Sequence, residues 1–243
     1  MNIIKLDAID STNNYLKKII LNEGVNDYTV VTAKFQTQGK GQLGTEWESE
    51  HSKNLICSVY KKEINIKVQD QFVISALVSL ALIKTLRKVN LSNMHIKWPN
   101  DIMSDNKKIC GILIENIVKE NYIKDTVIGI GLNVNQTIFN NLPNAASIKN
   151  LIGTTCSIDE ILKDLVKNIK YCFNELDKSS INSIFEKYED ALFRINKPST
   201  FKNSNGEVFS GYIKGVSRSG KLNVMLEDNL VESYDLKEIS MLN

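Results

Sequence analysis

Residues 94–135 read MHIKWPNDIMSDNKKICGILIENIVKENYIKDTVIGIGLNVN, and this stretch decides the fold. It contains three runs rich in apolar and β-branched residues, at 94–98, 108–118 and 122–132, each typical of a strand. A polar turn at 119–121 joins the last two runs. The stretch therefore predicts a β-sheet near the middle of the chain.

The flanking sequence predicts helices around this sheet and a change to short strands near the C-terminus. Helices are expected at 11–23, 69–89, 158–176 and 180–193, and strands at 28–32 and 55–60. Beyond Pro198, short strands are expected at 200–202, 208–216, 221–225 and 231–235, separated by Asn-Gly, Ser-Gly and Asp-Asn turns. We therefore predict an α+β domain over residues 1–195 and a small SH3-like β-domain over 196–243.

Composition restricts the classes of protein that this chain can belong to. With 243 residues, 42% of them hydrophobic and 24% charged, it matches a globular protein and not a disordered, collagenous or disulfide-scaffold class. Its formal charge of +2 is too balanced for a dedicated nucleic-acid binder or a polybasic membrane protein. The four cysteines lack CxxC spacing, and no secretory leader is evident, so we expect reduced thiols and a cytoplasmic location.

A glycine-rich loop at 36–47, QTQGKGQLGTEW, is the first candidate for chemistry. Closely spaced glycines let backbone N–H groups approach an anion, while Lys40 adds charge and Trp47 offers an aromatic face. The loop is neither a GxxxxGK[ST] phosphate loop nor a dinucleotide fingerprint. A mobile surface loop is the alternative interpretation.

Three further candidates lie within the central stretch. Lys97-Trp98-Pro99-Asn100-Asp101 combines a lysine, an amide and a carboxylate that could bind a phosphate, fix a hydroxyl and help to hold Mg²⁺, although a polar β-turn has the same composition. The strand at 107–115 begins with lysines and contains a glycine. The string GIGLNVN at 129–135 carries two glycines and ends in asparagines, as a ligand-contacting strand or a bulged strand end would.

Taken in order, these motifs resemble the biotin–protein ligases, also called biotin–acetyl-CoA-carboxylase ligases. The resemblance is carried by Asp10-Ser11-Thr12-Asn13, the glycine loop, KWPND at 97–101, Lys108 in a KxxGIL context and GIGLNVN at 129–135. It implies a mixed sheet with flanking helices, the class II synthetase-like catalytic fold, followed by an SH3-like barrel. It also implies an ATP- and Mg²⁺-dependent enzyme that converts biotin to biotinyl-5'-AMP and then transfers biotin to a lysine of a carboxylase's biotin carboxyl carrier domain.

The resemblance also assigns roles to individual residues. Lys108 is expected to be catalytic, offsetting the repulsion between the biotin carboxylate and the α-phosphate. Biotin contacts are expected from Ser11, Thr12, Asn13, Gln36, Gly39, Lys40, Gly41, Gln42, Lys108 and Gly111. Adenylate contacts are expected from Lys40, Trp47, Lys97, Asn100, Asp101, Lys108, Ile112, Gly129, Gly131 and Asn133, with Asp101 also a candidate Mg²⁺ contact.

One departure from the family pattern affects the loop. The family commonly has Gly-Arg-Gly-Arg where this chain has Gly39-Lys40-Gly41-Gln42. Lysine cannot reproduce the bidentate fork of arginine, so weaker retention of the adenylate is expected.

Two other functions stay open at this stage. A lipoate or octanoate ligase shares the catalytic fold, and a non-catalytic biotin-binding or adenylate-sensing module would fit the loop departure. Because the resemblance begins within ten residues of Met1, we expect no DNA-binding domain and no nucleic-acid partner. The chain is expected to be a monomer or a weak homodimer, with a candidate edge strand at 124–131.

Overall fold

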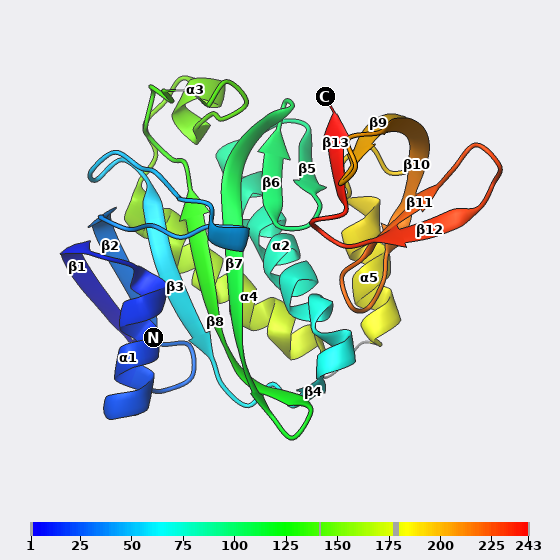
Figure 1. Cartoon of the computed structure of the whole chain (residues 1–243). Coiled ribbons are helices and arrows are strands. Elements are labelled where there is room, and N and C mark those ends of the chain that lie inside the picture. The colour runs from blue at the N-terminus through cyan, green and yellow to red at the C-terminus, as the bar shows by residue number, and fades with distance from the viewer. Residues whose placement is uncertain (1, 141, 177–179, 243) are drawn as a thin grey trace.

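A mixed β-sheet forms the centre of the molecule (Figure 1). The computed structural model describes residues 2–140, 142–176 and 180–242, so residues 1 and 243, the outer ends of the two predicted domains, lie outside it. The sheet has the strand order β1-β2-β3-β8-β7-β6-β5, with β4 paired to β8. β1 and β2 run parallel, whereas the other described pairs are antiparallel. These strands are β1 (Ile3–Ile9), β2 (Val30–Gln36), β3 (Leu55–Lys61), β4 (Ile66–Lys67), β5 (Met94–Lys97), β6 (Asp101–Ser104), β7 (Lys107–Lys119) and β8 (Tyr122–Leu132).

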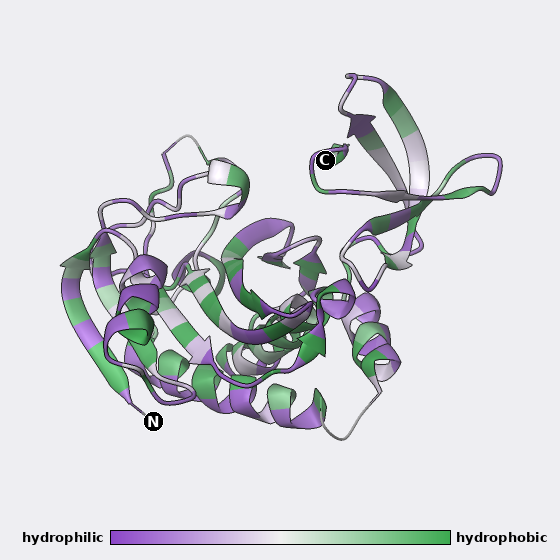
Figure 2. Cartoon of the chain, turned by 60° about the horizontal axis from the view of Figure 1, so that its bottom comes forward, coloured by the Kyte–Doolittle hydropathy of each residue, from purple (hydrophilic) through white to green (hydrophobic). Residues whose placement is uncertain are grey.

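Helices lie on both faces of this sheet. In Figure 1, α1 (Thr12–Asn22) lies in front of the strands, and α2 (Phe72–Leu86) and α4 (Ile158–Leu176) lie behind them. α2 packs against strands on one side and against α4 and α5 (Ile181–Asp190) on the other, so it is buried over almost its whole surface. In Figure 2, surface helices show hydrophobic and hydrophilic residues side by side, as expected for one-sided burial. The remaining helical segments are α3 (Ile148–Ile152), η1 (Gln42–Gly44), η2 (Val68–Asp70) and η3 (Arg87–Val89).

A second, antiparallel sheet follows at the C-terminal end. Its strands are β9 (Pro198–Asn203), β10 (Val208–Val216), β11 (Leu222–Met225), β12 (Val231–Tyr234) and β13 (Ile239–Leu242), in the order β12-β11-β10-β9-β13. This arrangement is consistent with the predicted SH3-like module, although no pair within the described strands joins β12 to β13 to close a barrel. The domain boundary near Ile195 stays a prediction.

The sequence-based elements agree with the structure in kind and differ mainly at their ends. The helix predicted at 69–89 is α2 with a short 3-10 turn before it and another after it. The candidate edge strand at 124–131 is wrong, because β8 pairs with both β3 and β7 inside the sheet. Cys57, Cys110 and Cys172 are free and buried, and burial raises the pKa of the Cys57 thiol to about 12. Of the helices in the described ranges, none has the length and hydropathy that a membrane span requires.

The second sheet contacts the first domain through the turn between β5 and β6. Trp98 Nε1 donates to the carbonyl of Gly220 at 2.8 Å, and Gly220 lies so close to Phe72 that a Cβ there would contact the Phe72 ring at 2.7 Å. Glu189 of α5 accepts a hydrogen bond from the Val216 amide at 2.8 Å. These contacts fix the C-terminal sheet beside the KWPND turn.

Candidate functional site

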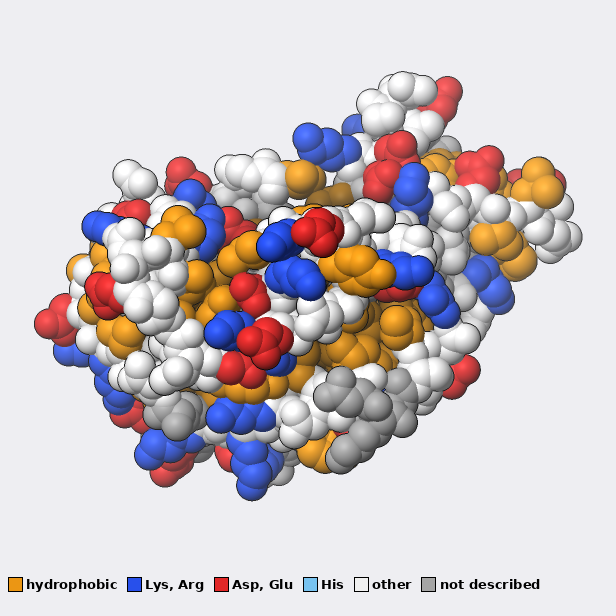
Figure 3. Space-filling view, turned by 90° about the horizontal axis from the view of Figure 1, so that it is seen from below, with side chains coloured by type: hydrophobic (Ala, Val, Ile, Leu, Met, Phe, Trp, Pro, Cys, Tyr) orange, Lys and Arg blue, Asp and Glu red, His pale blue; other side chains and the backbone are white. Residues whose placement is uncertain are grey.

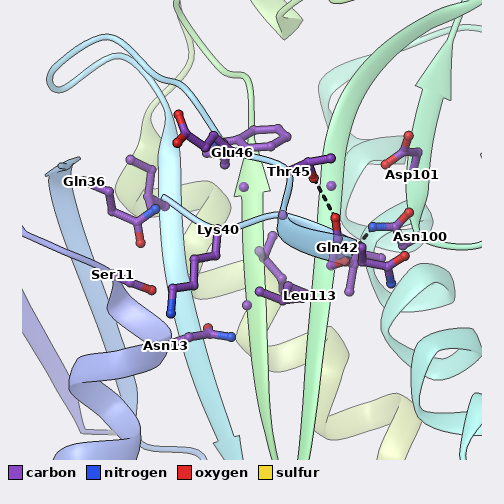
Figure 4. A pocket seen from close by; sticks show the side chains of 18 of the residues that line it. Ser11, Asn13, Gln36, Lys40, Gln42, Thr45, Glu46, Asn100, Asp101 and Leu113 are labelled. Atoms are coloured by element: carbon purple, nitrogen blue, oxygen red, sulfur yellow. Dashed lines mark hydrogen bonds between the residues drawn. The ribbon is translucent and has the colours of Figure 1, made fainter. Parts of the chain in front are cut away.

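A cavity of about 330 Å³ lies on the front face of the sheet, above β3, β8 and β7. Strand register places its floor in two rows: Ile56, Gly131, Gly111 and Asp101 form one row, and Ser58, Gly129 and Leu113 form the next. The N-terminus of α1 forms one wall, and the loop after β2 covers the top (Figure 4). The lining residues are Ser11, Thr12, Asn13, Gln36, Lys40, Gly41, Gln42, Leu43, Thr45, Glu46, Trp47, Ile56, Cys57, Pro99, Asn100, Asp101, Lys108, Gly111, Ile112, Leu113, Gly129, Ile130, Gly131 and Leu236.

Glycines in the floor give neighbouring side chains room to approach the strands. A Cβ at Gly129 would lie 2.6 Å from Asn13 Oδ1, and one at Gly131 would overlap the Trp47 indole. At Gly111 the nearest atom of the same indole would be 3.0 Å away. The glycines that the sequence analysis selected therefore accommodate one side chain from α1 and one from the loop.

The loop forms a closed turn over the cavity. The Trp47 amide donates to the Gly39 carbonyl at 2.9 Å, and the Gly41 amide donates to the Thr45 carbonyl at 2.7 Å. Lys40 extends downward toward α1 in Figure 4, where its Nζ donates to Asn14 Oδ1 at 3.2 Å. The loop thus bridges the sheet and the first helix.

An ion pair lies at the β6 and β7 end of the cavity. Lys108 Nζ is 2.8 Å from Asp101 Oδ1, and it lies 5.8 Å from the centre of the Trp47 ring. Burial raises the pKa of Asp101, and the Lys108 charge opposes that shift. Burial also lowers the pKa of Lys97. Lys108 and Asp101 therefore line this end of the cavity as an ion pair, and Lys97 lies outside the lining.

A bulge in β7 turns Lys108 toward the cavity. Ile102 pairs with Cys110, but Met103 pairs with Lys108, so Ile109 has no partner in the ladder. In a regular strand Lys108 and Gly111 would point to opposite faces, because side chains alternate. The extra residue changes this alternation, which is a common use of bulges near functional sites.

Hydroxyl and amide groups line the opposite end of the cavity. Ser11 is the N-cap of α1, and Thr12 and Asn13 follow in its first turn, all three buried. Gln36 Oε1 accepts from the Thr12 amide at 2.8 Å and lies 3.0 Å from Thr12 Oγ1. These four side chains carry several hydrogen-bonding groups and no formal charge, so they suit a neutral polar ligand, with the Lys40 ammonium at the edge of the wall beside Asn14.

Two buried polar atoms at the cavity, Gln42 Oε1 and Trp47 Nε1, have no hydrogen-bond partner among the described residues. A third, Asp101 Oδ1, contacts only the Lys108 ammonium, at 2.8 Å. Buried polar atoms are normally satisfied, so unsatisfied ones grouped at a cavity indicate a ligand-binding site. All three belong to the loop and ion-pair side of the cavity.

Most predicted site residues meet at this cavity, and three do not line it. Gly39 is buried beneath the loop, and Lys97 lies on β5 beyond Asp101. The Asn133 side chain is buried and donates to the carbonyl of Ala146 at 3.1 Å. Their ligand contacts stay predictions. Two-residue spacing from Gly111 could have revealed Leu113, whereas the sequence holds no signal for Leu236. The lining residues that sequence reasoning missed are Leu43, Thr45, Glu46, Ile56, Cys57, Pro99, Leu113, Ile130 and Leu236.

The site fits Mg²⁺ only together with an anionic ligand. Asp101 and the amide of Asn100 provide hard oxygen donors, but the described residues contain no cluster of three or more acidic, His or Cys side chains. Mg²⁺ is commonly held by one or two carboxylates plus substrate phosphates. Asp101 can therefore supply the single protein carboxylate of such a site.

We expect Gly131→Ala to displace the Trp47 indole, because the new methyl group would occupy the same space. In a chain that also carries Trp98→Phe, Trp47 is the one remaining tryptophan of two. Its fluorescence should shift to the red and become more accessible to acrylamide. Gly111→Ala is the control and should have a smaller effect, and equal spectra for the two variants would contradict this packing.

The comparisons with known proteins agree with this fold and site. Residues 6–133 match the model of the Biotin/lipoate A/B protein ligase family. The bifunctional ligase/repressor BirA of Escherichia coli is 24% identical over 242 residues, covering 99% of this chain and 74% of the relative. The biotin–[acetyl-CoA-carboxylase] ligase of Mycobacterium tuberculosis is 32% identical over 128 residues, covering 51% and 46%.

A solved structure shows the same fold over the whole chain. The biotin protein ligase of Aquifex aeolicus, in complex with biotin and ATP, superposes with a TM-score of 0.80 at 23% identity, covering 100% of this chain and 99% of that one. The family match spans 128 residues, more than half of the sequence, and includes most of the cavity. The chain therefore belongs to the biotin/lipoate A/B protein ligase family.

Proposed function

We propose that this chain is a biotin–protein ligase, which activates biotin with ATP to biotinyl-5'-AMP and transfers biotin to a lysine of an acceptor protein. One observation carries the proposal: a single cavity has an uncharged hydrogen-bonding wall at one end and the Lys108–Asp101 pair at the other. Biotin has a ureido ring at one end and a carboxylate at the other, so its two ends match the two ends of the cavity. The names of the relatives support the same activity.

The first step needs two anions to react, and Lys108 is placed to permit it. A carboxylate oxygen of biotin attacks the α-phosphorus of ATP, the bond to the β-phosphate oxygen breaks, and pyrophosphate leaves. The ammonium of Lys108, held by Asp101 at 2.8 Å, reduces the repulsion between the two anions and stabilises the charge of the transition state. Asp101 fixes the direction of this ammonium group.

The second step transfers the acyl group. The neutral amine of the acceptor lysine attacks the carbonyl carbon of the adenylate, its N–C bond forms, AMP leaves and the amine loses a proton. The loop from Gly39 to Trp47 covers the cavity, so it can keep water from the adenylate before the amine arrives. The closed turn of this loop would thus protect the adenylate from hydrolysis.

The nucleotide is expected at the loop and ion-pair side. Trp47 provides an aromatic face and an unpaired indole N–H, and Asn100 and Asp101 line the same cavity. Mg²⁺, bound by Asp101 and the phosphates, would add positive charge at the reacting phosphate. Asn13 and the Trp47 indole occupy the space directly above Gly129 and Gly131, so the expected adenylate contacts of these two glycines stay predictions.

The acceptor we propose is the carrier domain of a biotin-dependent carboxylase, such as acetyl-CoA carboxylase. A cytoplasmic location fits the four free cysteines. On the face shown in Figure 3, basic and acidic side chains are interspersed, in agreement with the formal charge of +2. Activity as a monomer or weak homodimer, without a nucleic-acid partner, completes the proposal.

Lipoate or octanoate ligation is the second candidate, because the matched family includes it. The wall formed by Ser11, Thr12 and Asn13 distinguishes a biotin substrate from a lipoate or octanoate substrate. A urea can form hydrogen bonds with these polar groups, whereas an alkyl chain or dithiolane cannot. Exchange of pyrophosphate into ATP tests both candidates in one assay. Exchange with biotin, followed by addition of biotin's mass to a carrier lysine, is expected, whereas exchange with lipoate or octanoate alone would overturn the proposal.

We expect Lys108→Ala to slow biotinyl-adenylate formation by about 10² or more, the scale for loss of one preorganised charge. Lys107→Ala is the matched control, because the neighbouring lysine donates to the Pro143 carbonyl at 2.7 Å outside the cavity. Single-turnover formation of the adenylate measures both variants. Near wild-type formation by the Lys108 variant would exclude the assigned role.

We expect Gln42→Arg to slow the release of biotinyl-5'-AMP, since arginine adds a charged donor fork beside the phosphate site. The Gln42 side-chain oxygen is buried without a partner in the described structure, so the position already faces the cavity. Release is measured by chasing labelled adenylate with unlabelled adenylate. An unchanged release rate would show that the loop departure has no effect on retention.

A further inference from the structure

Glu115 lies on β7 just beyond the cavity and holds Asn13 from below. Its Oε2 accepts from Asn13 Nδ2 at 2.7 Å, and its Oε1 accepts from Lys17 Nζ at 2.6 Å. Strand alternation puts it on the same face as Gly111 and Leu113 of the cavity floor. Glu115 does not line the cavity itself, so any effect on a ligand passes through Asn13.

This contact fixes the direction of the Asn13 amide. A carboxylate only accepts hydrogen bonds, so the NH₂ group of Asn13 has to face Glu115, and its oxygen has to face the other way. There Asn13 Oδ1 accepts from the buried Ser58 hydroxyl of β3, directly above Gly129. Both ends of the amide are therefore assigned by chemistry, without a free choice between two flips.

A similar argument assigns the orientation of the Gln36 amide beside Thr12. The Thr12 amide can only donate, so Gln36 presents its oxygen to α1 and turns its NH₂ group away from the helix. The Thr12 hydroxyl lies 3.0 Å from the same oxygen and 2.7 Å from Ser58 Oγ, and its one proton can go to either oxygen, because the single proton of Ser58 is donated to Asn13 Oδ1. The Gln36 NH₂ group receives no acceptor from the described residues, which leaves it as a donor for a ligand.

We propose that Glu115 and Ser58 are positioning residues that set the donor and acceptor directions of the Asn13 amide, beside Thr12 and Gln36, for a cyclic urea. The inference rests on the proposed function, because it assumes that the urea of biotin occupies this wall. Both residues act before the ligand arrives, so the wall needs no reorganisation on binding. Their loss should weaken biotin recognition and leave ATP recognition intact.

Glu115→Gln is the most direct test, because Lys17 determines which way the introduced amide points. Glutamine has one side-chain oxygen, and Lys17, which can only donate, competes for it. The introduced glutamine would then turn its NH₂ group toward Asn13 and reverse that amide. We expect the KM for biotin to rise about tenfold, equivalent to one lost hydrogen bond, with the KM for ATP unchanged.

The double variant Glu115→Gln with Lys17→Met separates positioning from simple ion-pair stability. Without Lys17 the glutamine oxygen is free to accept from Asn13, so the KM for biotin should return to within about threefold of the wild-type value. A purely structural ion pair predicts no such rescue. Asp159→Asn removes another lysine partner, Lys5 at 2.8 Å, away from the cavity, and should change neither KM.

Ser58→Ala provides an independent route if Glu115→Gln fails to fold. We expect a rise in the KM for biotin and a loss of affinity in calorimetric titration with biotin. Ser79→Ala is the matched control, because Ser79 is equally buried and its hydroxyl has no partner in the described structure. Wild-type protein that binds no biotin would overturn the proposed function and this inference together. Wild-type binding with unchanged affinity in Glu115→Gln and Ser58→Ala would overturn the inference alone.

Discussion

The site depends on one constraint, the absence of side chains at three neighbouring positions of β7 and β8. Gly111 and Gly131 lie opposite each other, and Gly129 lies in the next row, so together they open the floor of an otherwise well-filled sheet. Glycine weakens a strand, yet these strands are central and paired on both sides. The sheet can therefore tolerate the local cost, and the wall of α1 and the loop can approach the strands.

Charge is distributed unevenly around this opening, and the fold explains how. The bulge in β7 brings Lys108 to the cavity, and the β5–β6 turn brings Asp101 opposite Gly111. Both groups are partly buried, so their interaction is screened less than that of a surface pair. At the other end, the α1 N-terminus supplies neutral donors and acceptors. A cavity with one charged and one neutral end suits a ligand that has one neutral polar end and one anionic end.

The sequence predicts the parts of this protein that follow from local patterns. The strands at 122–132 and 208–216 and the helix at 158–176 match the structure residue for residue, because apolar periodicity marks both their type and their ends. Motifs carried by a resemblance identified Lys108 and the glycines of the floor. The sequence analysis missed β1, β6 and α3, although it found other four-residue strands such as β5 and β11.

Other features depend on contacts between distant residues, and local patterns cannot reveal them. The β7 bulge has no mark in the sequence, yet it decides which face Lys108 occupies. Glu115 reads as one more polar residue at the end of a strand, and only the fold brings it to Asn13, 102 positions away.

The β5–β6 turn shows why the two sheets act as one site. Asp101 and Asn100 follow Trp98, whose indole N–H is bound by the Gly220 carbonyl of the second sheet. Leu236, between β12 and β13, reaches the cavity as well. The residues that would face the nucleotide are thus supported from behind by the C-terminal strands, whereas the wall that would face the urea is supported by Glu115 and Ser58 of the central sheet. The two ends of the cavity therefore have separate supports, one from the second sheet and one from the central sheet.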